Sequence, residues 1–182
     1  MRAIRLYRYL LATCAALLMV GHVRLLYGTF SNIAAPDTRL ALGVSAPDFA
    51  LASTQSHNTV SLAGWRGRVV YLVFMATECS ISAAEMPVLE QWAAAHPAVA
   101  VLAVGRASLP ELAAYAGTQY PHITFLADFD GRVWNAYGAQ STPTAYIIDA
   151  AGWIRYSRIG GPSRLDQFDL QVQFVNTDWE TQ

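Results

Sequence analysis

The chain has 182 residues, of which 54% are hydrophobic, so it can form one ordinary globular domain with a proper core and a short extension. Its formal net charge is −1, but the charge is unevenly placed. Residues 1–36 carry four arginines and no acidic residue, whereas residues 37–182 carry eight arginines against thirteen acidic residues, a net charge of −5. This distribution argues against nucleic-acid binding, and the length argues against a second domain.

An uncharged, mostly apolar run of fifteen residues, 9–23, lies near the start of the chain and is followed by Arg24. Roughly 20 apolar residues are needed to cross a bilayer, so a span requires Arg24 to reach the membrane surface or find a partner. We expect an uncleaved single-pass anchor within residues 1–30, inserted through residues 6–30. A cleaved signal peptide and lipidation at Cys14 are the alternatives. In each case the excess of positive charge predicts that the remainder lies outside the cytoplasm.

Strands and helices alternate along the rest of the chain. Residues 31–42 are predicted to be a linker and residues 43–182 the folded domain. Within the domain we expect a hairpin formed by 49–51 and 59–62, a buried strand over 69–73, and a helix from Cys79 to about His96. Further on we expect strands over 98–104, 123–126, 145–148 and 153–159, helices over 109–118 and 133–137, and a terminal helix over 165–175 whose spacing also fits a strand. This order predicts an α/β fold.

Cys79 lies at the junction between the predicted buried strand and the predicted helix. A thiol at this junction lies beside the first unpaired N–H groups of the helix, whose partial positive charge favours the thiolate. The alternative is that Cys79 is buried and simply packs, as free cysteines often do. Its position therefore makes Cys79 a candidate for thiol chemistry.

The stretch around Cys79 resembles the active-site segment of the membrane-anchored TlpA/ResA-like thiol-disulfide oxidoreductases, which have the thioredoxin fold. That segment runs Phe-Trp-Ala-Thr-Trp-Cys-x-x-Cys-x-x-Glu-x-Pro, and the matching residues here are Phe74, Ala76, Thr77, Cys79, Glu85 and Pro87. The second cysteine of the pattern is Ser82 here, so the motif cannot form an internal disulfide. The tryptophan before the first cysteine is Glu78, whose charge should oppose thiolate formation.

Two further stretches carry the resemblance. Residues 43–49 are similar to the Gly-x-x-Ala-Pro-Asp-Phe motif that TlpA-like proteins and the AhpC/TSA peroxiredoxins share at the start of the domain. Thr142-Pro143-Thr144, followed by an apolar strand, matches the family's proline loop. The resemblance implies a central mixed sheet flanked by helices, with an N-terminal β-hairpin. It also implies a cis bond before Pro143, and a loop at Thr142 and Pro143 that faces Cys79 and pairs with the bound partner chain.

The resemblance suggests roles for two more residues. Glu85 corresponds to a carboxylate that handles protons near the thiols; the alternative is a solvated glutamate, because it lies six positions after Cys79 and nearly opposite on an ideal helix. Ser82 lies three positions after Cys79, where its hydroxyl can donate to a thiolate or simply fill space. The candidate catalytic residues are therefore Cys79, Ser82 and Glu85.

No cofactor is expected, because the four histidines are scattered and none has ligand spacing to Cys79. We expect a single-pass protein of the bacterial inner membrane, with a thioredoxin-like domain on the periplasmic side that exchanges disulfides with a protein partner through the Cys79 thiol. The competing hypothesis is a redox-inactive interaction or assembly subunit of a membrane complex, which Glu78, Ser82 and the charged Arg24 near the membrane favour.

Overall fold

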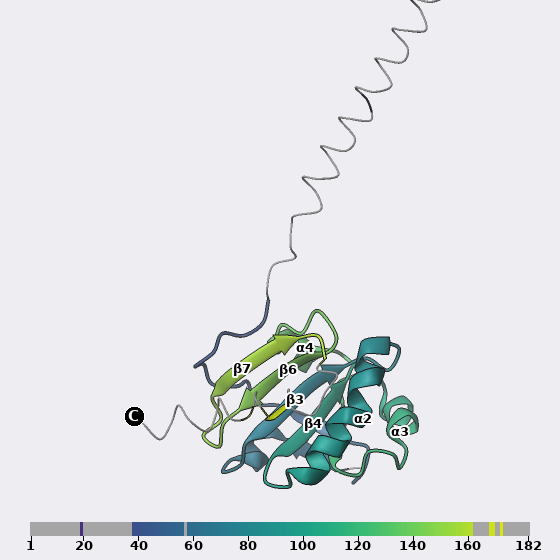
Figure 1. The fold of residues 1–182 in the computed structure, drawn as a ribbon, viewed down its shortest axis with the longest axis horizontal. Coiled ribbons are helices and arrows are strands. Elements are labelled where there is room, and N and C mark those ends of the chain that lie inside the picture. Colours follow the sequence, from purple (N-terminus) through teal and green to yellow (C-terminus); the bar gives the residue numbers. More distant parts are fainter. Residues whose placement is uncertain (1–18, 20–37, 57, 162–167, 170–171, 173–182) are drawn as a thin grey trace, which may run out of the picture. The chain divides into compact units, whose positions relative to one another are not determined.

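The computed structural model describes residues 38–56, 58–161, 168, 169 and 172, together with residue 19. Within these residues the fold is a seven-stranded sheet flanked by helices (Figure 1). The strands are β1 (Ala50–Ser53), β2 (Thr59–Ser61), β3 (Val70–Met75), β4 (Ala100–Gly105), β5 (Ile123–Ala127), β6 (Thr144–Ile148) and β7 (Ile154–Ile159). The helices are the 3-10 turn η1 (Leu62–Trp65), α2 (Ser80–Ala95), α3 (Leu109–Ala116) and α4 (Arg132–Ala136).

The sheet is mixed, as predicted, with the strand order β2-β1-β5-β4-β3-β6-β7. Strands β3, β4 and β5 are parallel, and the other pairs are antiparallel. At their carboxyl ends Met75 pairs with Gly105, and Gly105 pairs with Ala127. The loops that leave these three strands therefore start at the same edge of the sheet, and Cys79 is in the loop that follows β3.

Strand β3 forms the centre of the core, and all six of its residues are buried. Leu72 and Phe74 point to the face that α4 covers, whereas Tyr71, Val73 and Met75 point to the face that α2 and α3 cover. A strand packed on both faces and paired on both sides is a rigid base for the loop that follows it.

Most predicted elements are present with small shifts at their ends. The hairpin forms with Leu51 opposite Val60, and β3 runs two residues further than predicted, to Met75. In the predicted terminal helix, Phe168, Asp169 and Val172 are described, and all three are helical.

The predicted linker is shorter than expected, because its last residues bind the folded domain. The Thr38 hydroxyl donates to the Gly138 carbonyl (2.7 Å), and the Leu40 N–H donates to the Tyr146 hydroxyl (3.2 Å). Further along, Gly43 N–H donates to the Ile154 carbonyl (2.7 Å) and Ile154 N–H to the Val44 carbonyl (2.9 Å). Residues 38–44 thus lie against the domain.

Among the residues that the structure describes, no helix is long and apolar enough to cross a membrane. The predicted anchor over residues 1–30 lies outside the described residues except for residue 19.

Candidate active site

Cys79 is the N-cap residue of α2, and three residues separate it from the end of β3. Its backbone is extended (φ −84°, ψ 116°), and its carbonyl accepts the Ala83 N–H, which starts the helix. The thiol is free and half-buried, which excludes the alternative of a thiol packed in the core. The predicted start of the helix at Cys79 is confirmed.

The loop before β6 faces this thiol. The Thr142–Pro143 peptide bond is cis, as the resemblance implies. The Cys79 Sγ donates to the Thr142 carbonyl (3.5 Å), so residues 63 positions apart in the chain are in contact. On the other side of the loop, Gly160 N–H, just after β7, donates to the Pro143 carbonyl (2.8 Å). Thr142 and Pro143 therefore lie between the thiol and the end of β7.

Hydrogen bonding lowers the pKa of Cys79 from 9.0 to about 7. The largest cause is a hydrogen bond from the Thr142 side chain to the thiolate, followed by hydrogen bonds from the Ser82 backbone and side chain. Desolvation opposes them, and the Ile81 backbone adds a smaller lowering contribution. The thiolate is thus stabilised by the loop across from it and by the first turn of α2.

Replacing Thr142 with valine removes the largest of these hydrogen bonds while keeping the shape of the side chain. We expect Thr142→Val to raise the pKa of Cys79 by roughly half to one pH unit, the size of one net hydrogen bond. The rate of thiol alkylation measured against pH reports this pKa. Thr77→Val is the matched control, because the Thr77 hydroxyl donates to Glu78 instead (3.1 Å). Equal pKa values in the two variants would show that the Thr142 hydroxyl does not stabilise the thiolate.

Ser82 and Glu85 are both buried on α2, so Glu85 is not the solvated glutamate of the alternative interpretation. Among the residues that the structure describes, the Ser82 hydroxyl has no partner that meets hydrogen-bond geometry, although it lowers the pKa of Cys79. Both observations fit a hydroxyl that lies near the sulfur and turns toward it when the thiolate forms.

Glu85 pairs with Arg158, a residue that sequence reasoning missed. Arg158 lies on β7, and its Nη2 donates to Glu85 Oε1; the same guanidinium donates to the Tyr71 hydroxyl on β3. Burial raises the pKa of Glu85 to about 7, although the charge of Arg158 and its hydrogen bond act in the opposite direction. Glu85 therefore titrates in the same range of pH as Cys79.

The titration of Glu85 predicts how stability depends on pH. Its pKa is raised from 4.5 to about 7, so between these values the folded chain holds a proton that the unfolded chain has lost. The free energy of unfolding should therefore fall as the pH rises from about 4.5 to about 7, by about 3 kcal/mol. Between pH 7 and about pH 9 the folded chain has lost the Cys79 proton that the unfolded chain still holds, because the pKa of Cys79 is lowered. The free energy of unfolding should therefore rise again over this range.

Denaturant unfolding at a series of pH values measures this fall. Glu85→Gln should flatten the profile between pH 4.5 and 7, because the variant has no carboxyl at this position. Glu78→Gln, which removes an exposed carboxylate just before the same helix, is the control for the loss of a carboxylate as such. A profile that is flat in the native chain would contradict the raised pKa of Glu85.

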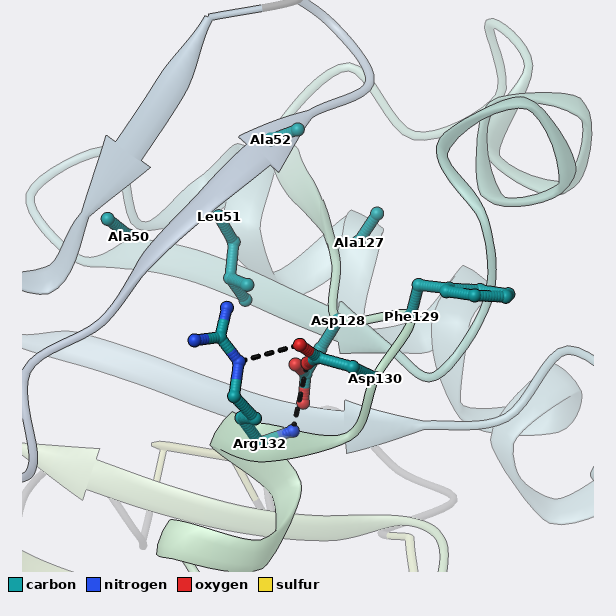
Figure 2. Close-up of a pocket in the computed structure, with 8 residues that line it drawn as sticks. All are labelled: Ala50, Leu51, Ala52, Ala127, Asp128, Phe129, Asp130 and Arg132. Carbon is teal, nitrogen blue, oxygen red and sulfur yellow. Dashed lines mark hydrogen bonds and ion pairs between the residues drawn. The ribbon is translucent and has the colours of Figure 1, made fainter.

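Outside the thiol site, the described residues form a shallow pocket but no metal site. Among the described residues, no group of three or more histidine, cysteine, aspartate and glutamate side chains could hold a metal ion. A shallow pocket of about 270 Å³ lies between β1 and the loop 128–131, and Cys79 does not line it (Figure 2). In that loop Asp130 pairs with Arg132, and Asp128 accepts the Trp134 N–H (2.9 Å), so both carboxylates bind the first turn of α4.

A mixed sheet with a thiol at the N-terminus of a helix, facing a cis-proline loop, defines a thioredoxin-like protein. The model of the AhpC/TSA family matches residues 42–157, and the chain belongs to this family. The match covers the described site except for Arg158 and the residues that follow it.

Similar proteins agree with this assignment. The thiol-disulfide oxidoreductase ResA of Geobacillus kaustophilus is 29% identical over 83% of this chain and 88% of its own length. The thioredoxin-like protein YneN of Bacillus subtilis is 33% identical over 82% of this chain and 89% of its own length. A crystal structure from Chlorobium tepidum, provisionally assigned as a thiol:disulfide interchange protein DsbE, superposes with a TM-score of 0.68 at 27% identity, covering 74% of this chain and 96% of that one. The class of activity is thiol-disulfide oxidoreductase.

Proposed function

We infer that the chain exchanges disulfides through a single thiol, Cys79, in an exported domain that residues 6–30 tether to the membrane. The observation that carries the proposal is the Cys79 thiol, which is accessible, has a pKa lowered to about 7, and contacts the Thr142 carbonyl. Position 82, where the related motif has its second cysteine, is a buried serine. The first turn of α2 therefore contributes one sulfur to the reaction.

The exchange takes place in two steps. The Cys79 thiolate attacks one sulfur of a partner disulfide R–S–S–R′, the S–S bond breaks, and R′–S⁻ leaves with the electron pair, so that Cys79 and R form a mixed disulfide. A second thiolate, from the partner itself or a small thiol, then attacks the sulfur of R. This step forms a new disulfide on R and restores the Cys79 thiolate. Exchange needs no other oxidant or reductant.

The surface around the thiol fits an extended partner segment with an apolar side chain near its disulfide. Ile81 lies in the first turn of α2, two residues after Cys79, and Ile159 pairs with Thr144 at the end of β7. Both side chains are 53% exposed. Because these residues adjoin Cys79 and the Pro143 loop, they would contact a partner whose backbone pairs with Thr142.

An alkylation titration of the full chain, with Cys14→Ser so that one thiol remains, tests the proposal. We expect the rate at Cys79 to rise with a midpoint near pH 7, and the folded protein to form a mixed disulfide with a small aromatic disulfide. A thiol that reacts only after denaturation would overturn the proposal. That result would support the redox-inactive assembly subunit, which Glu78 and Ser82 favour in the sequence.

The tether is supported by the apolar run near the N-terminus and by the arginines that precede it. These features favour a single-pass protein of the bacterial inner membrane with the thioredoxin-like domain on the periplasmic side. Intact-mass measurement of the protein purified from its native membrane should show residues 6–30 still attached. A mature chain that starts near Asp37 would instead indicate a cleaved signal peptide and a domain that is not anchored.

A further inference from the structure

Arg158 is held between three elements beside the thiol site. From β7 its Nε and Nη2 donate to the Tyr71 hydroxyl on β3 (3.2 and 2.6 Å), and its Nη2 also donates to Glu85 Oε1 on α2. Tyr71 and Glu85 are 0% and 1% exposed, and Arg158 is 9% exposed. Such a buried pair contributes little net stability, because desolvation of both charges offsets their attraction. Its presence here therefore calls for a reason other than stability.

The pair leaves one carboxylate oxygen open. Glu85 Oε2 is buried and, among the described residues, has no hydrogen-bond partner. Gly161 makes room for it, because a Cβ at this position would lie 2.6 Å from Oε2. Arg158 thus fixes one oxygen of Glu85 and leaves the other able to take or give a proton.

Two connections join this carboxylate to the thiol. Along α2, Ser82 lies three residues after Cys79 and three before Glu85, and in the described part of the chain its buried hydroxyl also has no hydrogen-bond partner. Just after β7, Gly160, next to the glycine that accommodates Oε2, donates its N–H to the Pro143 carbonyl. Ser82 therefore lies between Cys79 and Glu85 along α2, and Gly160 and Gly161 lie between the Pro143 loop and Glu85.

The geometry points to Arg158 as a positioning residue of the redox site, which holds Glu85 so that its free oxygen exchanges a proton with the reacting sulfurs. The inference rests on the proposed exchange reaction. When R′–S⁻ leaves the partner disulfide, protonated Glu85 gives up its proton, R′–SH forms, and Arg158 balances the new carboxylate charge. When the second thiol enters, its proton returns to Glu85, so the cycle leaves no net proton behind.

The groups around Glu85 are consistent with this role. Tyr71 has its pKa raised, mainly by burial, so it stays a neutral phenol, and Tyr156 on β7 is the other titratable group that acts on it. On α2 itself the polar groups nearest in sequence on this side are Ser82 and Cys79. Arg158 is the only cation among the groups that shift the pKa of Glu85 in the described part of the chain. Its removal should therefore leave Glu85 protonated well above neutral pH.

The test follows the Glu85 carboxyl directly, in the full chain, by infrared difference spectroscopy against pH. The band of the protonated carboxyl is identified by its loss in Glu85→Gln. We expect Arg158→Gln to raise the midpoint of this titration by at least one pH unit, and Arg158→Lys, which restores a cation, to bring it back toward the native value. Arg155→Gln is the matched control, since Arg155 lies on the same strand but pairs with Asp149 (2.7 Å). An unchanged midpoint in Arg158→Gln would overturn the inference.

A second readout is the pH profile of exchange with a small aromatic disulfide. If Arg158 acts through Glu85, then Arg158→Gln and Glu85→Gln should show the same altered profile, and the double variant should show no further change. If the double variant lost as much exchange rate as the two single variants together, and the pH profile of the rate stayed unchanged, Arg158 would have a merely structural role. That result would overturn the inference. A variant Arg158→Gln that unfolds at pH 7.5 but folds at pH 6 would support it, because the unpaired carboxylate is then what disrupts the fold. Unfolding at both pH values, in the single and the double variant alike, would count against it.

The two readouts separate this inference from the proposed function. Arg158→Gln could raise the midpoint of the Glu85 titration although the native chain exchanges no disulfides. That result would overturn the exchange reaction but support the positioning of Glu85 by Arg158. An unchanged midpoint in a chain that does exchange disulfides would overturn the role of Arg158 alone.

Discussion

Ser82→Cys is expected to convert the site into a dithiol that closes a reversible disulfide with Cys79 and reduces a protein disulfide at least tenfold faster. Cβ atoms three residues apart on a regular helix are about 5 to 6 Å apart, whereas a disulfide needs roughly 3.5 to 4.5 Å. The first turn can tighten to close this gap, because Cys79 is the N-cap and its own backbone is extended rather than helical. The gain in rate arises because the second thiol attacks the mixed disulfide within the same molecule.

Free thiols counted before and after mild oxidation detect this disulfide, and reduction of insulin measures the activity. Ala84→Cys is the matched control, because it adds a second thiol at an exposed position of the same helix. Failure of Ser82→Cys to form a disulfide would contradict the helix start at Cys79. A disulfide that forms but brings no activity would mean that the loop at Thr142 and Pro143 no longer receives a partner, as in the redox-inactive alternative.

Cys79→Ser is expected to lower the rate of disulfide exchange at least about a thousandfold, because a hydroxyl cannot form the mixed disulfide through which exchange proceeds. The fold should survive, since the thiol is only half-buried and its hydrogen bond to the Thr142 carbonyl is long (3.5 Å). Circular dichroism checks the fold, and reaction with a small aromatic disulfide measures the rate.

Cys14→Ser is the control for the loss of a thiol as such, because it removes the other cysteine of the chain. It should exchange disulfides at the native rate. Exchange that persists in Cys79→Ser and disappears in Cys14→Ser would mean that the reactive thiol had been assigned to the wrong cysteine.

The strand ending before Cys79, the helix after it and the loop at Pro143 could all be predicted, because each depends on a local pattern or on a motif that resembles a known family. The ion pair of Glu85 could not. Its partner, Arg158, lies 73 residues away on β7, where apolar and polar residues alternate only weakly. No local pattern indicates which helix residue an arginine on a strand will contact.

The burial of Glu85 could not be predicted from the sequence, for a different reason. Counting 100° per residue from Cys79 assumes a regular helix, but the N-cap lies outside the helical conformation. The face on which Glu85 lies is determined by how α2 packs on the sheet, through Met86, Leu89 and Trp92. That packing becomes visible only once the fold is known.

Residues 43–46 have a consequence for any shortened form of the protein. β7 is the last strand of the sheet, and a strand in this place offers unpaired backbone groups to other chains. The hydrogen bonds of Gly43 and Val44 with Ile154, and of Ala46 with Gly152, cover the beginning of that edge. A truncation that starts at Thr38 keeps this cover, whereas one that starts after Ala46 uncovers the strand that carries Arg158 and makes the fragment prone to self-association.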